Sequence, residues 1–197
     1  MFEKYISKRT ALKTMAAAGV SMALGLSGAK GAEMMHPKIL TVYFTWGGAS
    51  GEAAQIIHKF VGGDIVRIQT QMTLPEDYEE MVKIHKAWSA AQEHPAIQPL
   101  GVNVADYDVI ILGHGIWSGK LPMPVRSFLD KVDFKGKKFL HFACHGGSGL
   151  GQSQNELGNM FPEADLMPGL PLYGWGGLRD ADKIEPWLVR MGLLPKK

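Results

Sequence analysis

The chain has 197 residues, of which 46% are hydrophobic and 20% charged, and its formal net charge is +2. This composition is that of an ordinary globular protein, and the length suits one domain with an appended segment. The single cysteine, Cys144, excludes an intramolecular disulfide. Five of the 21 basic and one of the 19 acidic residues precede residue 32, so the remainder holds 16 against 18, near −2. That charge gives no argument for nucleic acid or an anionic membrane as a partner.

The N-terminal residues are typical of an export signal. A basic stretch precedes an uncharged run over 14–29 and small residues near Gly31 and Ala32. The run is shorter than the roughly 20 residues that span a bilayer, and glycine and serine dilute it. We predict a signal peptide over 1–31, cleaved near Gly31 or Ala32, and one domain over 32–197. The alternative is an amphipathic helix of the domain, but here charge and apolarity follow one another in blocks.

Residues 7–13 resemble the twin-arginine export signal, with Lys8 in place of the first arginine and Ala11 in place of the phenylalanine. The resemblance implies export of a protein already folded around its cofactor. The general secretory route is the alternative, and a noncovalent cofactor would then have to be loaded outside. On either route we expect a periplasmic or otherwise extracytoplasmic protein, with no stable membrane span after signal cleavage.

The first predicted elements of the domain are two strands with a helix between them. The run 39–44 is uncharged, β-branched and aromatic, which indicates a strand buried on both faces. Apolar residues then recur at helical spacing over 53–60, and Gly62 and Gly63 end the helix. The alternating segment 64–69 indicates a second, less buried strand.

A long polar helix begins near 74–77 and stops before Pro95. Its inner face is marked by Tyr78, Met81, Val82, His85 and Trp88 or Ser89. Further strands are predicted over 109–113, 138–143 and 165–172, and further helices over 123–132, 153–160 and 182–191.

Five strands that alternate with helices predict a doubly wound parallel sheet, because parallel neighbours need right-handed helical crossovers on the two faces. Ligands of such sheets bind beyond the carboxyl ends of the strands, where the strand order switches. The segments that follow the three most apolar strands are therefore the candidate site. We call 45–51 the first loop, 114–120 the second loop and 144–151 the third loop.

The first loop is rich in glycine and hydroxyl groups and leads into a helix N-terminus, where free amides and the helix dipole favour a phosphate. It contains no lysine and matches neither the P-loop nor the dinucleotide-binding fingerprint. Such an uncharged nest suits a monophosphate better than a triphosphate with magnesium. The alternative is a glycine turn that merely connects the strand to the helix.

The second loop places Trp117 among flexible residues at a strand exit, where a planar heteroaromatic ring could stack on it. Alternatively, Trp117 folds over the core. The third loop is open, glycine-rich backbone that can offer N–H and C=O groups to the edge of a ring.

The third loop also raises three other hypotheses. A nucleophilic Cys144 beside His145 is disfavoured because adjacent residues at a strand end point apart. A metal held by His141, Cys144 and His145 lacks a fourth ligand. A Gly-x-Ser-x-Gly elbow, which an esterase would need, is absent from the sequence. We therefore expect no catalytic residue and no metal ligand, and a buried thiol with a satisfied core histidine.

Taken together, these motifs resemble those of the flavodoxin family over residues 38–177. The stretches that carry the resemblance are 43–50, 106–113 with Ile116 and Trp117, 121–129 and 145–149. The resemblance implies an α/β, flavodoxin-like doubly wound five-stranded parallel sheet in the order 2-1-3-4-5, with helices on both faces. It also implies one bound FMN at the switch point.

The resemblance implies a role for each loop. Hydroxyls of Thr45 and Ser50 and the amides of 46–51 would hold the phosphate, Trp117 would stack on the flavin ring, and backbone groups of 117–119 would face its N5. The implied FMN-binding residues are Thr45, Trp46, Gly47, Gly48, Ala49, Ser50, Gly51, Ile116, Trp117, Ser118, Gly119, Cys144, His145, Gly146, Gly147, Ser148 and Gly149. Those of the third loop would line the pyrimidine edge.

The sequence departs from the family pattern in three places. Residues 47–50 replace the usual hydroxyl-Gly-Asn-Thr, and losing about two hydrogen bonds of about 1 kcal/mol each would weaken FMN binding about ten- to a hundredfold. The third loop lacks the tyrosine that many flavodoxins stack on the outer face of the ring, which leaves His145 as the substitute. The domain is also less acidic than flavodoxins that dock on basic partners.

We predict an electron carrier that exchanges electrons with redox partner proteins or small acceptors, in which the flavin supplies the chemistry. One alternative is an FMN-dependent reductase of quinones or other small electrophiles, with His114 or His145 as proton donor. Another is a flavin-free interaction module, which the reduced phosphate loop would suit.

Overall fold

The computed structural model describes residues 37–196. The predicted signal peptide and its cleavage position lie outside the described residues, so both stay predictions. The centre of the described part is a parallel sheet in the order β2-β1-β3-β4-β5, with β6 also paired to β4. Its strands are β1 (Ile39–Tyr43), β2 (Asp64–Arg67), β3 (Val109–Gly115), β4 (Lys138–His145), β5 (Asp165–Leu166) and β6 (Leu170–Tyr173). The predicted strand order 2-1-3-4-5 is confirmed.

The predicted fifth strand, 165–172, is interrupted in the structure. β5 pairs with the start of β4 and β6 with its end, and 167–169 separate them. Pro168 has no N–H to donate to a neighbouring strand. A Cβ on Gly169 would lie 2.3 Å from Nε2 of His141, so the chain passes this ring without room for a side chain.

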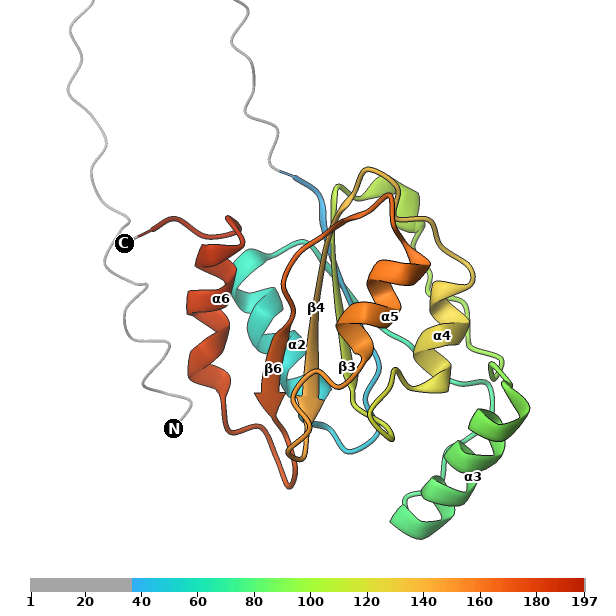
Figure 1. Ribbon diagram of the computed structural model, residues 1–197. Coiled ribbons are helices and arrows are strands. Elements are labelled where there is room, and N and C mark those ends of the chain that lie inside the picture. The colour runs from blue at the N-terminus through green and yellow to red at the C-terminus, as the bar shows by residue number, and fades with distance from the viewer. Residues whose placement is uncertain (1–36, 197) are drawn as a thin grey trace, which may run out of the picture. The chain divides into compact units, whose positions relative to one another are not determined.

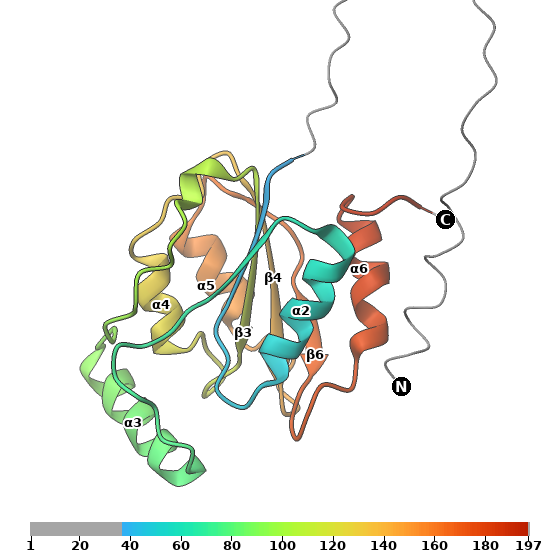
Figure 2. The same ribbon diagram turned by 180° about the vertical axis from the view of Figure 1, so that it is seen from behind.

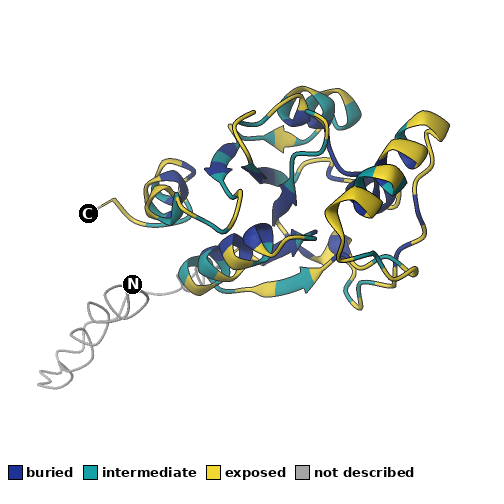
Figure 3. Cartoon of the chain, turned by 90° about the horizontal axis from the view of Figure 1, so that it is seen from below, coloured by how far each residue is buried: buried dark blue, intermediate teal, exposed yellow. Residues whose placement is uncertain are grey.

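Helices cover both faces of the sheet (Figures 1 and 2). α2 (Ala49–Val61) and α6 (Ile184–Arg190) lie on one face, and α4 (Met123–Leu129) and α5 (Ser153–Met160) lie on the other. Successive residues of β3 point to opposite faces, since Ile111 packs with α2 and α6 whereas Ile110 and Leu112 pack with α4 and α5. Figure 3 shows buried residues on the sheet and on the inner sides of the helices.

The remaining long helix, α3 (Tyr78–Ala91), stands beside the sheet instead of on either face (Figures 1 and 2). Its N-cap is Asp77, whose carboxylate accepts the N–H of Glu80 at 2.9 Å. Met81 and Trp88 pack against Met123 at the start of α4. The inner face predicted from the sequence therefore exists, but only part of it meets the core. Within residues 37–196, no helix is long and apolar enough to cross a membrane.

Candidate functional site

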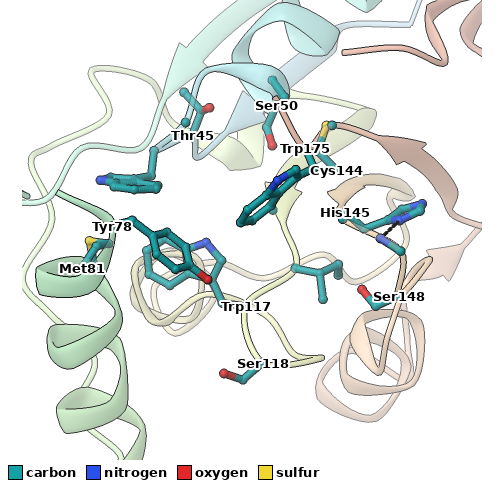
Figure 4. Close-up of a pocket in the computed structure, with 18 of the residues that line it drawn as sticks. Thr45, Ser50, Tyr78, Met81, Trp117, Ser118, Cys144, His145, Ser148 and Trp175 are labelled. Atoms are coloured by element: carbon teal, nitrogen blue, oxygen red, sulfur yellow. Dashed lines mark hydrogen bonds between the residues drawn. The ribbon is translucent and has the colours of Figure 1, made fainter. Parts of the chain in front are cut away.

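A cavity of about 1090 Å³ opens at the carboxyl ends of the central strands (Figure 4). The first, second and third loops line it together, as expected at the switch in strand order. Of the predicted FMN-binding residues, only Gly48, Gly51 and Gly149 lie outside its lining. Segments about one hundred residues apart in sequence are thus brought around one space.

The first loop turns into α2 at Gly48, which has φ 92° and donates its N–H to Oγ1 of Thr45 at 3.0 Å. No side chain of the described residues caps α2, so the amides of its first turn are left for a ligand. The guanidinium of Arg67, at the end of β2, donates to the carbonyl of Thr45 at 3.1 Å. This ordered turn with unused amides has the chemistry of an anion site.

Ser50 lines the cavity but is only 4% exposed, and its hydroxyl hydrogen-bonds the thiol of Cys144. Burial raises the pKa of Cys144 to about 11, although the bond from Ser50 acts in the opposite direction. The thiol is therefore protonated near neutral pH, which argues against the Cys144 nucleophile. Among residues 37–196, no group of three potential ligands is placed to hold a metal ion.

The second loop forms a tight turn in which Trp117 and Lys120 exchange two backbone hydrogen bonds of 3.0 Å. Both central residues are left-handed, Ser118 at φ 50° and Gly119 at φ 78°, as in a type I′ turn. The hydroxyl of Ser118 bonds Nε2 of His85 at 3.0 Å. His85 thereby connects α3 to the turn, and burial lowers its pKa.

The ring of Trp117 is half-buried. Its edge-on neighbours are Phe44, at a centroid distance of 5.5 Å, and His85, at 5.3 Å. Trp117 therefore combines both sequence interpretations, because it packs on the core and also lines the cavity.

In the third loop, Nδ1 of His145 accepts the N–H of Gly147 at 2.9 Å, which places the proton of the neutral ring on Nε2. A Cβ at Gly147, or at Gly47 across the cavity, would meet no described atom within 4 Å. Both glycines therefore face open space and let a ligand approach the backbone closely.

His114 was a candidate proton donor, and the structure shows that this hypothesis is wrong. Its ring is fully buried, outside the cavity lining, and stacks on His141 with 5.7 Å between centroids. Burial, together with the nearby His141, lowers the pKa of His114 to about 3. An imidazole that stays neutral and has no access to the cavity cannot deliver a proton there. His145 is the remaining candidate.

Two walls of the cavity were missed by the sequence analysis. One is the inner face of α3, and the other is the loop that follows β6. The lining residues of these walls are Tyr78, Met81, Val82 and His85 of α3, and Tyr173, Gly174, Trp175 and Gly176 at and after the end of β6. Phe44, next to the first loop, and Gly115, in the second loop, also line the cavity. The sequence contained a feature that could have indicated each of these two walls. The face of α3 was visible from its spacing, and Gly174-Trp175-Gly176 sets an aromatic residue among glycines, as the second loop does.

Solved structures share this fold. A candidate flavoprotein from Bacteroides eggerthii is 27% identical, with 80% of this chain and 99% of that one covered and a TM-score of 0.69. A second, from Bacteroides uniformis, is 24% identical over 78% and 98%, with a TM-score of 0.66. A Lactobacillus acidophilus flavoprotein in complex with FMN is 18% identical over 77% and 99%, with a TM-score of 0.63.

A comparison with curated proteins finds no match. The sequence model of a family described as Flavodoxin matches residues 38–190. This range contains the whole sheet and all the loops that line the cavity. Since the match extends over well more than half of the chain, the protein belongs to the flavodoxin family.

Proposed function

We propose that this protein binds FMN in the cavity and acts as an exported electron carrier. The observation that carries the proposal is the pairing of an anion site with an aromatic slot in one cavity. The first-turn amides of α2 lie on one side, and Trp117 with the open glycine backbone lies on the other. FMN has a monophosphate and a planar ring, which match these two parts.

The residues present fit this cofactor. The first loop contains backbone amides and hydroxyls but no lysine, which suits one phosphate. The cavity is large enough for a flavin mononucleotide. The Lactobacillus acidophilus relative was solved in complex with FMN. Bound FMN would supply reversible electron transfer, while the chain orients the ring, restricts water and determines which partners can approach.

The first experiment is to purify the protein, record its visible spectrum and titrate it with FMN. We expect a flavin spectrum, or a saturable change in FMN fluorescence, with an affinity about ten- to a hundredfold weaker than a full set of phosphate donors would give. A colourless protein without a fluorescence change would contradict both redox functions. It would favour the flavin-free interaction module.

Trp117→Ala tests the assignment of the ring to the second loop. We expect weaker FMN binding by about 5- to 150-fold, because aromatic stacking on a base-like ring contributes about 1–3 kcal/mol. Fluorescence titration measures the affinity, and urea unfolding of the FMN-free variant reveals how much of the change comes from lost packing on Phe44. An unchanged affinity and flavin spectrum would remove Trp117 from the site.

A second function, an FMN-dependent reductase of quinones or other small electrophiles, is favoured by one observation. At about 1090 Å³ the cavity reaches the upper end of the range for small-molecule sites, and α3 adds an apolar wall beyond the three loops. His145 lines it with Nε2 as a donor. Continuous oxidation of NADH or NADPH with a quinone by the purified protein alone would favour this reductase over the carrier.

The export proposal rests on the pattern of residues 1–31. Mass spectrometry of the protein recovered from cell fractions tests it. We expect an extracytoplasmic protein that starts near residue 32. A full-length protein that stays in the cytoplasm would contradict export, and Lys8→Ala together with Arg9→Ala would show whether the basic pair is needed.

A further inference from the structure

Trp175 is the largest exposed ring at the mouth of the cavity, and no sequence motif assigned it a role. The third loop has no tyrosine or tryptophan to cover the outer face of the flavin ring, and its one ring, that of His145, already accepts the N–H of Gly147. We propose that Trp175, from the loop after β6, provides this second stacking surface, opposite Trp117. This inference rests on the proposed FMN binding.

The sheet brings the loop after β6 beside the third loop. β6 pairs in parallel with β4, so that Leu172 lies opposite Cys144 and Tyr173 opposite His145. The pairing continues one residue further, because the N–H of Gly174 donates to the carbonyl of His145 at 2.9 Å. The next residue, Trp175, therefore leaves the sheet next to the third loop.

Two glycines fit the indole to this place. A Cβ on Gly174 would lie 2.9 Å from Cβ of Cys144 and 3.0 Å from Cβ of Ala49, so the chain crosses here only without a side chain. A Cβ on Gly146 would lie 3.3 Å from Cε3 of Trp175. The indole thus rests on the bare backbone of the third loop, and a side chain on Gly146 would press against it.

The exposure of Trp175 is unusual. Its exposed fraction is 59%, and that of Tyr78 is 54%, whereas most large apolar side chains of residues 37–196 are buried. Both residues line the cavity, and their rings meet edge to face at 5.8 Å across its mouth (Figure 4). Exposed aromatic surface that is gathered at one cavity indicates a ligand with an apolar face.

The order of the strands places the two indoles on opposite sides of β4. β3 and β6 flank β4, so Trp117 follows the strand on one side of β4 and Trp175 follows the strand on the other. The glycine backbone of the third loop lies between them. In the proposed arrangement, a flat ring with one edge toward Gly146 and Gly147 would have Trp117 on one side and Trp175 on the other.

The test compares Trp175→Ala and Trp175→Phe with the wild-type protein in FMN titrations. We expect Trp175→Ala to bind FMN about 5- to 150-fold more weakly, and Trp175→Phe to recover most of the affinity because it keeps a ring. We also expect bound FMN to fluoresce more strongly in Trp175→Ala, because a stacked indole quenches flavin emission. Met72→Ala, which shortens an exposed side chain outside the cavity lining, is the matched control and should bind like wild type.

The outcomes separate this inference from the proposed function. If the wild-type protein binds FMN and Trp175→Ala binds it within twofold with unchanged emission, the inference is wrong and FMN binding stands. If Trp175→Phe is as weak as Trp175→Ala, stacking is wrong as the mechanism. If the wild-type protein does not bind FMN, the proposed function fails and this inference fails with it.

Discussion

Gly169 shows how a single position can be determined by a distant side chain. It lies in the gap between β5 and β6, against the ring of His141, whose Nε2 bonds Oε1 of Gln154 at 2.9 Å. The N–H of Gly169 donates to the same amide oxygen at 2.8 Å. One glutamine of α5 thus holds both the buried histidine and the strand break.

Gly169→Ala should destabilise the protein by about 1–3 kcal/mol, because the new methyl group would overlap His141. Urea unfolding measures the change. The matched control is Gly158→Ala in the interior of α5, where the nearest atom, Cδ2 of Leu166, would lie at an ordinary 3.6 Å. That variant should gain about 0.5–1 kcal/mol from the alanine. If both variants change the free energy of unfolding in the same direction, the lack of space beside His141 does not explain the effect of Gly169→Ala.

Sequence alone could not give the role of Gly169 or of Trp175. Each depends on a contact between segments that are far apart in the chain, with His141 in one case and Gly146 in the other. The role of Trp117 could be predicted because it follows a strand whose apolar run is visible in the sequence. The residues next to recognisable strands were therefore predicted to lie at the site, and those placed by long-range packing were not.

At the scale of elements, α4 and α5 are tied together next to the second loop. Glu156 of α5 accepts from Arg126 of α4 at 2.7 Å and, through its other oxygen, from the N–H of Leu121 at 2.9 Å. The two charged side chains are only 20% and 16% exposed. This carboxylate therefore fixes the end of the second loop as well as the helix pair.

Glu156→Gln should cost about 1–3 kcal/mol, because it leaves the largely buried guanidinium of Arg126 without its counter-charge. The control is Glu163→Gln, which removes a carboxylate from the ion pair with Lys135, where the side chains are 64% and 68% exposed. We expect that change to stay within about 0.5 kcal/mol. Denaturant unfolding of both variants makes the comparison, and similar losses would contradict the special role of Glu156.

Periodicity predicted most elements, and the reasons for the failures are physical. The apolar runs 39–44 and 109–113 were strands because both their faces are covered. The spacing in α3 correctly gave its inner face, but periodicity does not say whether such a face meets a sheet or a cavity. The split of 165–172 was missed because an apolar pattern does not register the bulk of a histidine on the neighbouring strand.

At the scale of the whole molecule, buried histidines make stability depend on pH. Burial lowers the pKa of His114 to about 3 and that of His141 to about 4, and it also lowers the pKa of His85. In the unfolded chain these groups take up protons near pH 6.5. Below that pH the unfolded state binds protons that the folded state does not, so acid favours unfolding.

We therefore expect full stability above about pH 6.5 and a loss of up to about 1.4 kcal/mol per pH unit for each of His114 and His141 as the pH falls toward 4. Urea unfolding between pH 7 and pH 4.5 would measure it. His141→Gln removes the contribution of His141 to the pH dependence of the unfolding free energy. The part of that pH dependence that His114 and His141 produce together should therefore fall by about half. An unchanged slope would mean that other groups carry the acid sensitivity.

The position of α3 has a consequence for time scales. The main packing partner of α3 is α4. The segment before α3 is held to the first loop by a hydrogen bond of 2.7 Å from the indole N–H of Trp46 to the carbonyl of Pro75. The outer side of α3 is exposed. A helix attached in this way can detach transiently while the sheet stays folded, so its amides should exchange hydrogen for deuterium sooner than those of α2.

FMN bound against the inner face of α3 should slow that exchange, which mass spectrometry of peptic fragments can follow. Equal exchange in α2 and α3 would contradict this view. The lifetime of the bound flavin, as distinct from its affinity, would then be governed by how often this one helix moves away.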